Sequence, residues 1–204
     1  MSLTGMAYSE SAPAKPVKPK MVKQYMLGSL LGEGSYGKVR EAIDSNTLRR
    51  VAVKIVDKRR LYKVRGAEEQ QKREIAMQRK LSHRGVVGVI EQISLEEKPD
   101  KLYYVFELVT GGSLQALLES YPEGRLPLCL CHRLFGQLLD ALEHCHAKGV
   151  IHRDIKPANL MITADGQLKL SDFGSAELIG TYHSEDTLTK SSGSPAFHSP
   201  EVAN

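Results

Sequence analysis

The stretch VIHRDIKPANLMI, at residues 150–162, decides the fold of this chain. Its charged residues are of the kinds that phosphoryl transfer requires, because that reaction depends mainly on positioning and on neutralisation of charge. Asp154 can accept the hydrogen of an attacking hydroxyl and aim its oxygen at a phosphorus atom. Lys156, two residues later, can neutralise a γ-phosphate as it moves. The stretch therefore predicts a loop that serves the transfer of a phosphoryl group.

Two oxygen donors follow this aspartate. Asn159 lies in the same stretch, and Asp172 opens the tripeptide DFG at residues 172–174. Amide and carboxylate oxygens suit magnesium, which bridges phosphates and takes up their charge. A lone HRD or DFG tripeptide can arise by chance, so these residues gain their meaning from what precedes them in the chain.

A glycine-rich segment, Gly32-x-Gly34-x-x-Gly37-x-Val39, lies between two predicted strands. Glycines there let the backbone approach phosphates and offer N–H groups to their oxygens. The same spacing also opens dinucleotide-binding helices, or merely decorates a hairpin. Residues 38–42 continue as a strand, which argues against the dinucleotide interpretation.

A lysine follows the glycine-rich segment inside the apolar run VAVKI, residues 51–55. A lysine in such a strand normally points its amine to solvent, but after a glycine-rich hairpin Lys54 can reach the α- and β-phosphates. Glu74, on a predicted helix, is its natural acidic partner; the alternative is a solvated face shared with Lys72 and Arg73. All these motifs in one order make coincidence negligible and predict an ATP-dependent phosphotransferase.

Residues 1–24 are rich in Pro, Ala, Ser and Lys and lack periodicity, which predicts a disordered basic tail. The remaining chain, 25–204, begins with short strand-like runs and then turns to longer helical ones. The change predicts a small lobe over about 25–109 and a large lobe over 110–204. The predicted strands lie within 25–44 (two strands), 49–57, 88–96, 101–109, 159–163 and 168–172, and the helices at 67–81, 114–120 and 127–148.

Composition excludes several other classes of protein. The net charge is +4, too small for the footprint of a nucleic-acid binder, and three cysteines argue against a disulfide scaffold. No apolar run reaches the roughly 18 residues of a membrane span. We therefore expect a soluble cytoplasmic protein without nucleic-acid or membrane partners. Lysines in the tail leave a nuclear fraction open as an alternative to a solvated linker.

The chain resembles the protein kinase family over residues 25–204. The resemblance implies an α+β, bilobal protein-kinase fold, with ATP and Mg²⁺ bound between the lobes. Lys156 and the Ser194 of GSPAFHSPE look like the serine/threonine class, in which Ser194 contacts the catalytic loop. Within the family, DSNTLRR at 44–50 and GSPAF…PEVAN most resemble the liver kinase B group, which activates AMP-activated-type kinases. The calmodulin-dependent kinase kinases are the alternative.

The resemblance also implies roles for individual residues. Phe106 would be the gatekeeper, Glu107 and Val109 would offer backbone groups to adenine, and Met161 would lie beneath the base. The implied catalytic residues are Asp154, Lys156, Lys54 and Glu74, and the implied magnesium ligands are Asn159 and Asp172. The implied ATP-binding residues are Leu31, Gly32, Glu33, Gly34, Ser35, Tyr36, Gly37, Lys38, Val39, Ala52, Lys54, Phe106, Glu107, Val109 and Met161.

Three features depart from the family pattern. Gln78 occupies a helix position where the family stacks an apolar residue between the lobes, so we expect a weaker bias toward the active state. The motif that normally reads Ala-Pro-Glu is Ser199-Pro200-Glu201. The chain ends at Asn204, before the central helix of the large lobe, so we expect a complete small lobe, an incomplete large lobe and little turnover.

Partners and regulation follow from the resemblance alone. The substrate would be a protein, and specifically another kinase, while a pseudokinase adaptor and a scaffold protein would activate the enzyme. A phosphate on Thr187, Thr189, Ser191 or Ser192 would meet Arg153; the alternative is an ordinary polar loop. The alternative function is a non-catalytic nucleotide-binding or regulatory fragment of a kinase.

Overall fold

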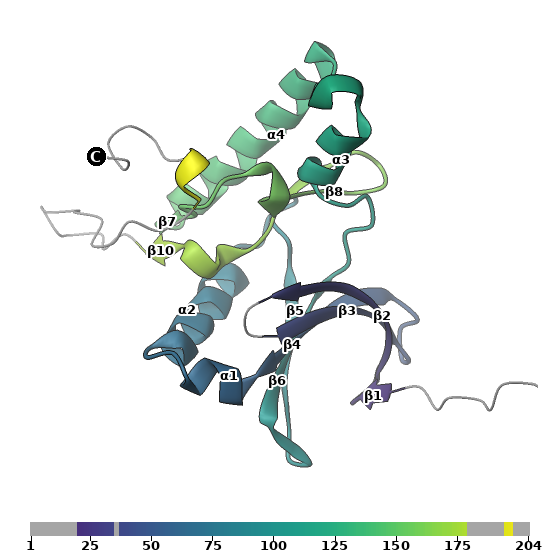
Figure 1. Ribbon diagram of the computed structural model, residues 1–204, viewed down its shortest axis with the longest axis vertical. Coiled ribbons are helices and arrows are strands. Elements are labelled where there is room, and N and C mark those ends of the chain that lie inside the picture. Colours follow the sequence, from purple (N-terminus) through teal and green to yellow (C-terminus); the bar gives the residue numbers. More distant parts are fainter. Residues whose placement is uncertain (1–19, 35–36, 179–193, 198–204) are drawn as a thin grey trace, which may run out of the picture.

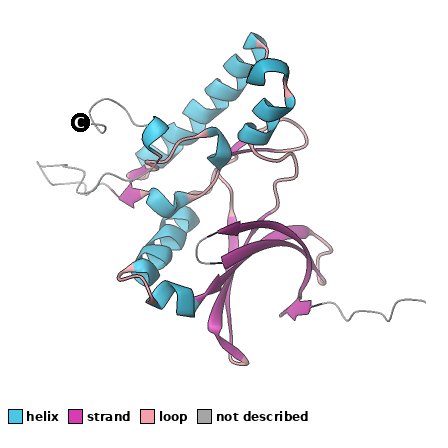
Figure 2. Ribbon diagram, viewed as in Figure 1, coloured by secondary structure: helices cyan, strands magenta, loops and turns pink. Residues whose placement is uncertain are grey.

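The computed structural model describes residues 20–34, 37–178 and 194–197, which form two lobes (Figures 1 and 2). The small lobe contains a β-sheet with helices α1 and α2, and the large lobe contains α3, α4 and two short sheets. This α+β class was predicted from the sequence and is confirmed. The elements are β1 (Lys20–Val22), β2 (Tyr25–Gly34), β3 (Gly37–Asp44), β4 (Arg50–Asp57), α1 (Lys58–Tyr62), α2 (Ala67–Lys80), β5 (Val89–Leu95), β6 (Lys98–Glu107), α3 (Leu114–Ser120), α4 (Leu128–Ala147), β7 (Val150–Ile151), β8 (Leu160–Ile162), β9 (Leu168–Leu170) and β10 (Glu177–Leu178), with single 3₁₀ turns at η1 (Pro122–Gly124), η2 (Pro157–Asn159), η3 (Phe173–Ser175) and η4 (Pro195–Phe197).

The small lobe is built on a six-stranded antiparallel sheet with the order β1-β2-β3-β4-β6-β5. The alternating valines of β4 are buried, as expected of β-branched residues on the inner face of a sheet. In the pairing register Val39 of β3 lies opposite Lys54 of β4, and Ala52 of β4 lies opposite Phe106 of β6. The sheet therefore brings the glycine-rich hairpin, the strand lysine and the predicted gatekeeper onto four neighbouring strands, β2, β3, β4 and β6.

Strand β1 corrects the predicted tail over residues 1–24 at its C-terminal end. It pairs with β2 through a turn in which Lys23 has φ 48°, and Val22 is completely buried. A strand of three residues gains its hydrogen bonds only from its partner, so no local pattern announces it. Residues 1–19 of the predicted tail lie outside the described residues.

A short helix, α1, was missed by the sequence analysis. The Asp57 carboxylate accepts a hydrogen bond from the Arg59 backbone N at 3.0 Å and caps the helix, and Leu61 is completely buried. Five residues with a single apolar contact give no measurable helical period, so the helix depends on its cap and on that one buried leucine.

Helix α2 buries three polar side chains, Gln71, Glu74 and Gln78. Gln78 is 3% exposed, and its Nε2 donates to the Val87 carbonyl at 2.8 Å. The buried amide therefore has its hydrogen bond and holds the connection between α2 and β5. The expected effect of Gln78 on the bias toward an active state stays a prediction.

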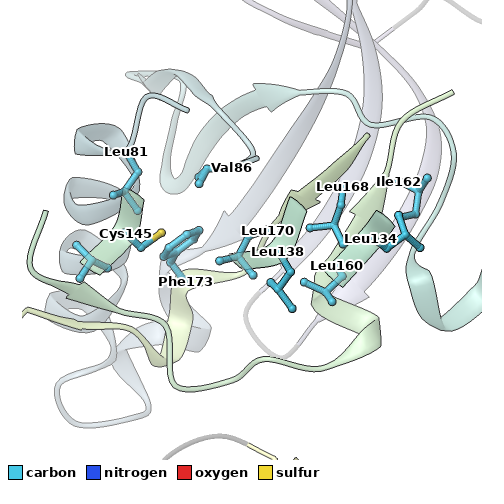
Figure 3. Packing of buried hydrophobic residues seen from close by; sticks show 11 residues of the cluster. Leu81, Val86, Leu134, Leu138, Cys145, Leu160, Ile162, Leu168, Leu170 and Phe173 are labelled. Carbon is cyan, nitrogen blue, oxygen red and sulfur yellow. The ribbon is translucent and has the colours of Figure 1, made fainter. Parts of the chain in front are cut away.

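The core of the large lobe lies between α4 and the hairpin β8–β9 (Figure 3). Leu134, Leu138, Ala141 and Cys145 face inward from successive turns of α4, as helical periodicity requires. Phe173, in the turn after β9, is completely buried in the same cluster. The packing of this helix therefore supports the chain that runs from β7 to η3, which carries the predicted catalytic residues.

A second face of α4 is apolar and exposed. Leu128 is 84% exposed, Phe135 60% and Leu139 50%, and their spacing places them along one side of the helix. Leu128 and Phe135, with Leu114 and Leu118 of α3, line an apolar groove of about 420 Å³. Although α4 is 20 residues long, no helix in the described ranges combines the length and apolarity that a membrane crossing needs.

The connection between α2 and β5 docks tightly on α4. A Cβ atom added at Gly85 would lie 2.8 Å from the Ala141 Cβ, so only glycine fits against the helix there. The Leu170 N donates to the Gly85 carbonyl at 2.8 Å. The rings of His83 and His144 stack with centroids 4.7 Å apart and planes 13° from parallel. This stack joins the small-lobe connection to the large lobe.

The two stacked histidines have different polar contacts. His83 Nδ1 accepts from the Gly85 N at 3.1 Å, and His83 Nε2 lies 3.6 Å from an Asp140 oxygen. His144 Nε2 is buried without a partner among the described residues. Burial, followed by the nearby charges of His83 and Lys148, lowers the pKa of His144, which Asp140 only partly opposes.

We predict that stability falls as the pH drops below about 6.5, the ordinary pKa of histidine. Because the folded pKa of His144 lies below that value, the unfolded chain binds the proton first, and the stability is fully present only above that pH. His144→Phe should keep the stack and reduce the loss, measured by urea unfolding between pH 5 and 8. Phenylalanine at the exposed His132 is the matched control. An unchanged pH profile in His144→Phe would contradict the prediction.

Candidate active site

Only one of the two carboxylate oxygens of Asp154 accepts hydrogen bonds from the described residues. Its Oδ2 accepts from Lys156 Nζ at 2.7 Å and from Asn159 Nδ2 at 2.9 Å. Asn159 Nδ2 also donates to the Asp154 carbonyl at 2.8 Å. The other oxygen, Oδ1, is buried and has no hydrogen-bond partner among the described residues. A buried carboxylate oxygen without a donor can accept a hydroxyl hydrogen from a substrate.

Opposing effects set the pKa of Asp154. Burial raises this pKa, but hydrogen bonds from Lys156, Ser194 and Asn159 and the charge of Lys156 lower it by more, so it lies below its usual value. The carboxylate is therefore ionised at neutral pH and is a weak proton acceptor, better suited to orienting a hydroxyl than to deprotonating it. Lys156 Nζ also donates to Ser194 Oγ at 2.7 Å, which confirms the predicted contact of Ser194 with this loop.

A buried histidine connects the Asp154 loop to the DFG segment. His152 is 1% exposed, and its Nε2 lies 2.9 Å from the Ser171 carbonyl, while its Nδ1 lies 3.3 Å from the Asp154 N. Nε2 therefore donates and Nδ1 accepts, which makes the ring neutral; burial lowers the pKa of His152 accordingly. The ring also meets Phe173 edge to face at 4.8 Å.

The predicted magnesium ligands lie on adjoining segments. The Ser171 N donates to the Asn159 carbonyl at 2.9 Å, which places Asp172, the next residue, beside the asparagine. Asp172 has φ 60°, and its Oδ1 accepts weakly from the Gly174 N at 3.4 Å. A non-glycine residue in the left-handed region is uncommon and, where the surroundings hold it, often marks a functional site.

Lys54 reaches its predicted partner. Its Nζ lies 2.8 Å from Glu74 Oε1, and the Glu74 side chain is only 8% exposed. Gln71 Nε2 donates to the other Glu74 oxygen at 2.8 Å, so both oxygens have donors. From the same helix, Gln70 Nε2 donates to the Gly174 carbonyl at 2.8 Å. Helix α2 therefore positions the lysine and contacts the DFG segment directly.

The glycine-rich hairpin closes where Gly34 of β2 pairs with Gly37 of β3. A Cβ atom on Gly37 would lie 1.9 Å from the Ile55 carbonyl oxygen, so the packing of β3 on β4 excludes any side chain there. Ser35 and Tyr36, at the tip, lie outside the described residues. The packing of the sheet therefore requires glycine at position 37, in addition to any role of this residue with phosphates.

The predicted adenine-binding residues lie on both lobes. Leu31 on β2 is 49% exposed, and Ala52 faces Phe106 across β4 and β6. Met161 lies on β8 and forms an isolated bridge with Ser113. Of the remaining residues predicted for this site, Gly32 and Val39 pair across the hairpin, Glu33 and Lys38 form a surface ion pair at 3.2 Å, and Val109 follows β6.

The backbone N–H and the side chain of Glu107 both make hydrogen bonds within the chain. Its backbone N donates to the Gly88 carbonyl at 3.0 Å, so this N–H cannot serve adenine, and only its carbonyl keeps the predicted role. Its Oε1 accepts from the Gly88 N at 2.7 Å and from Lys169 Nζ at 2.8 Å. The side chain therefore ties the end of β6 to β9 in the other lobe.

Several contributing residues were missed by the sequence analysis. Gln71 and Ser171 are ordinary polar residues whose task appears only when the helix and the loop meet. Glu177 was also missed: Arg153 Nη1 lies 2.5 Å from its Oε2, and Arg153 Nε donates to the Ser175 carbonyl at 2.7 Å. The only available signal for Glu177 was an acidic residue shortly after the DFG tripeptide.

Comparisons with known proteins agree with this geometry. The family model of the protein kinase domain matches residues 25–204. The serine/threonine-protein kinase STK11 of Homo sapiens is 46% identical over 187 residues, which are 92% of this chain and 43% of that protein. Its homologue in Dictyostelium discoideum is 46% identical over 184 residues, and par-4 of Caenorhabditis elegans is 41% identical over 183 residues. The chain spans less than half the length of these curated relatives.

Proposed function

The chain belongs to the protein kinase family, and on that premise we propose that it binds ATP with magnesium and phosphorylates a protein serine or threonine. The observation that carries the proposal is the state of Asp154. One of its oxygens is held by Lys156 and Asn159, while the other is buried and open. This arrangement suits a carboxylate that receives a substrate hydroxyl and aims it at the γ-phosphorus.

The described residues fit magnesium and ATP. Asn159 uses its amide nitrogen on Asp154, which leaves its amide oxygen as the atom for a metal, and Asp172 offers a carboxylate from the adjoining segment. When bound, magnesium would bridge the phosphates and neutralise their charge. Lys54 is held by Glu74 and would bind the α- and β-phosphates, while Lys156 would neutralise the group that moves.

The hydroxyl is oriented by electrostatics and by position. Asp154 Oδ1 accepts the hydroxyl hydrogen, so that the oxygen lone pair faces the γ-phosphate. In the proposed reaction the serine or threonine oxygen would bond to the γ-phosphorus as the bond to the leaving ADP oxygen breaks, and the hydroxyl proton would pass to Asp154 Oδ1 late in the reaction. Lys156, whose Nζ lies 2.7 Å from Asp154 Oδ2, would neutralise the phosphoryl group as it moves.

A second candidate function is a nucleotide-binding or regulatory fragment with little turnover. The exposed apolar side of α4 favours it, because Leu128 and Phe135 have no covering element among the described residues. An uncovered helix holds its neighbours less rigidly, and catalysis tolerates displacements of only about 0.5 Å. Nucleotide binding relies on the sheet, Lys54 and Glu74, so we propose that it survives better than transfer.

We predict that Mg-ATP raises the melting temperature of this chain, by a few degrees at about 100 times its dissociation constant. Differential scanning fluorimetry with ATP, with and without magnesium, measures the rise, and AMP is the control. No rise at saturating Mg-ATP would contradict nucleotide binding. Transfer of radiolabelled phosphate to a generic serine/threonine substrate separates the two functions.

The relatives are named serine/threonine-protein kinases, and these names support a protein as the substrate class. We further propose that the substrate is another kinase and that a pseudokinase adaptor and a scaffold protein regulate the enzyme. These finer proposals rest on the likeness of the chain to the liver kinase B group. Phosphorylation of a kinase substrate, compared with a generic protein, tests the first of them.

A further inference from the structure

A glutamine on α2 links that helix to the strand that leads to Asp172. Gln78 is 3% exposed, and its Nε2 donates to the Val87 carbonyl at 2.8 Å in a buried hydrogen bond. An apolar side chain, which the resemblance to the family predicts at this position, could not donate this bond. Gln78 lies four residues after Glu74, so both side chains project from nearly the same face of the helix. The bond therefore starts from the part of α2 that holds Lys54.

The connection between α2 and β5 continues this link into β9. Both polar backbone groups of Leu170 are bonded to it: the carbonyl accepts from the Val87 N at 2.9 Å, and the N donates to the Gly85 carbonyl at 2.8 Å. Val86 forms a parallel bridge with Leu170, and both side chains lie in the core cluster of the large lobe (Figure 3). Val86 is 1% exposed and Leu170 is completely buried. The link therefore ends inside the core, two residues before Asp172.

The residue between Leu170 and Asp172 is bonded to the opposite side. Ser171 N donates to the Asn159 carbonyl at 2.9 Å, and the Ser171 carbonyl lies 2.9 Å from His152 Nε2. The backbone that leads to Asp172 is therefore bonded on one side to the loop that carries the proposed catalytic residues and on the other to the connection from α2. On the second side, the hydrogen bond of Gln78 ties that connection back to the helix.

We propose that Gln78 is a positioning residue, which acts through Val87 and Leu170 to fix the Lys54–Glu74 pair relative to Asp172. The inference deepens the proposed function, in which Lys54 binds phosphates and Asp172 binds the magnesium that bridges them, so that their separation must be constant. A hydrogen bond is directional and restricts the distance between its two atoms, whereas apolar contact is not directional. The buried amide thus makes a directional link where an apolar residue is expected.

The first test is hydrogen exchange, which requires no nucleotide. Gln78→Met nearly keeps the volume of the side chain but removes the donor, and it should raise exchange at the amides of Val87 and Leu170 by about 10-fold. Gln78→Glu keeps the shape and directs an acceptor at the Val87 carbonyl, so its increase should be larger. The matched control is Ile93→Val, which removes one methyl group from a residue that is 1% exposed in the separate core of the small lobe. Its exchange at the same two amides should stay close to wild type.

The second test separates positioning from a merely structural role. It compares the affinity for ATP in magnesium with the affinity in EDTA and takes the ratio as the gain due to the metal. Gln78→Met should reduce this gain several-fold and leave the affinity in EDTA unchanged, because the lysine keeps Glu74 while the metal ligand loses its fixed position. A general loss of stability would lower both affinities. Ile93→Val should keep the gain of the wild type.

Unchanged exchange at Val87 and Leu170 in both Gln78 variants would overturn the inference. A normal metal gain in Gln78→Met would also overturn it, as would an equal loss of the gain in Ile93→Val. A wild-type chain that binds no nucleotide, or shows no metal gain, would instead refute the proposed function, and the exchange experiment would still decide whether Gln78 makes the link. If Gln78→Glu fails to fold, Gln78→Met beside Ile93→Val supplies the comparison. The predicted phosphorylation positions take no part in the inference and lie outside the described residues: Thr187, Thr189, Ser191 and Ser192.

Discussion

Asparagine in place of Asp154 should reduce turnover by at least about 100-fold. The substitution keeps the shape of the side chain but removes its charge and one accepting oxygen. In the wild-type carboxylate, one oxygen accepts hydrogen bonds from Lys156 and Asn159, and the other has no donor among the described residues. The amide has only one accepting oxygen, so it cannot accept from Lys156 and Asn159 and also accept the hydrogen of the substrate hydroxyl. The hydroxyl would therefore lose its orientation. Steady-state phosphorylation measures the turnover.

The affinity for ATP should stay close to normal in the same variant, because Asp154 has no role in holding the nucleotide. Asp165→Asn, in the exposed turn between β8 and β9, is the matched control and should leave both quantities unchanged. A variant that retains most of its turnover would show that Asp154 does not orient the hydroxyl. A parallel loss of affinity would place it among the nucleotide-binding residues instead.

Methionine in place of Lys54 should lower the affinity for Mg-ATP by at least about 10-fold, the loss expected for a charged contact of about 1.4 kcal/mol. Lys54 Nζ lies 2.8 Å from Glu74, and the hairpin residue Val39 faces it in the sheet. Removal of the amine takes away the proposed phosphate contact and leaves the buried Glu74 with Gln71 as its donor.

The measurement is direct titration with a fluorescent ATP analogue, since the melting temperature alone would mix affinity with stability. Lys80→Met, on the exposed side of α2, is the matched control. Lys54→Arg keeps a positive charge near Glu74 and should fold, so it reports whether the particular position of the amine matters. Normal affinity in Lys54→Met would remove Lys54 from the phosphate site.

The longer helices and strands were predictable because their apolar residues repeat at a regular spacing within each element. Helix α3 occupies the predicted residues 114–120, and α4 lies within the predicted 127–148. The strands β2 to β6 also lie close to their predictions, since glycines and charged turns separate their apolar runs. Strand β1 and helix α1 were missed because they have three and five residues and depend on a partner strand and on a cap.

The sequence by itself determined the family and the residue types of the site, because phosphoryl transfer needs an aspartate, a lysine and oxygen donors in an order that chance does not reproduce. Only the tertiary structure decided which of those groups are already engaged. The N–H of Glu107 is used by Gly88, one oxygen of Asp154 is used by its neighbours, and Arg153 is used by Glu177. Hydrogen-bond partners far apart in the chain meet only after packing, and burial then decides the pKa and the freedom of each group.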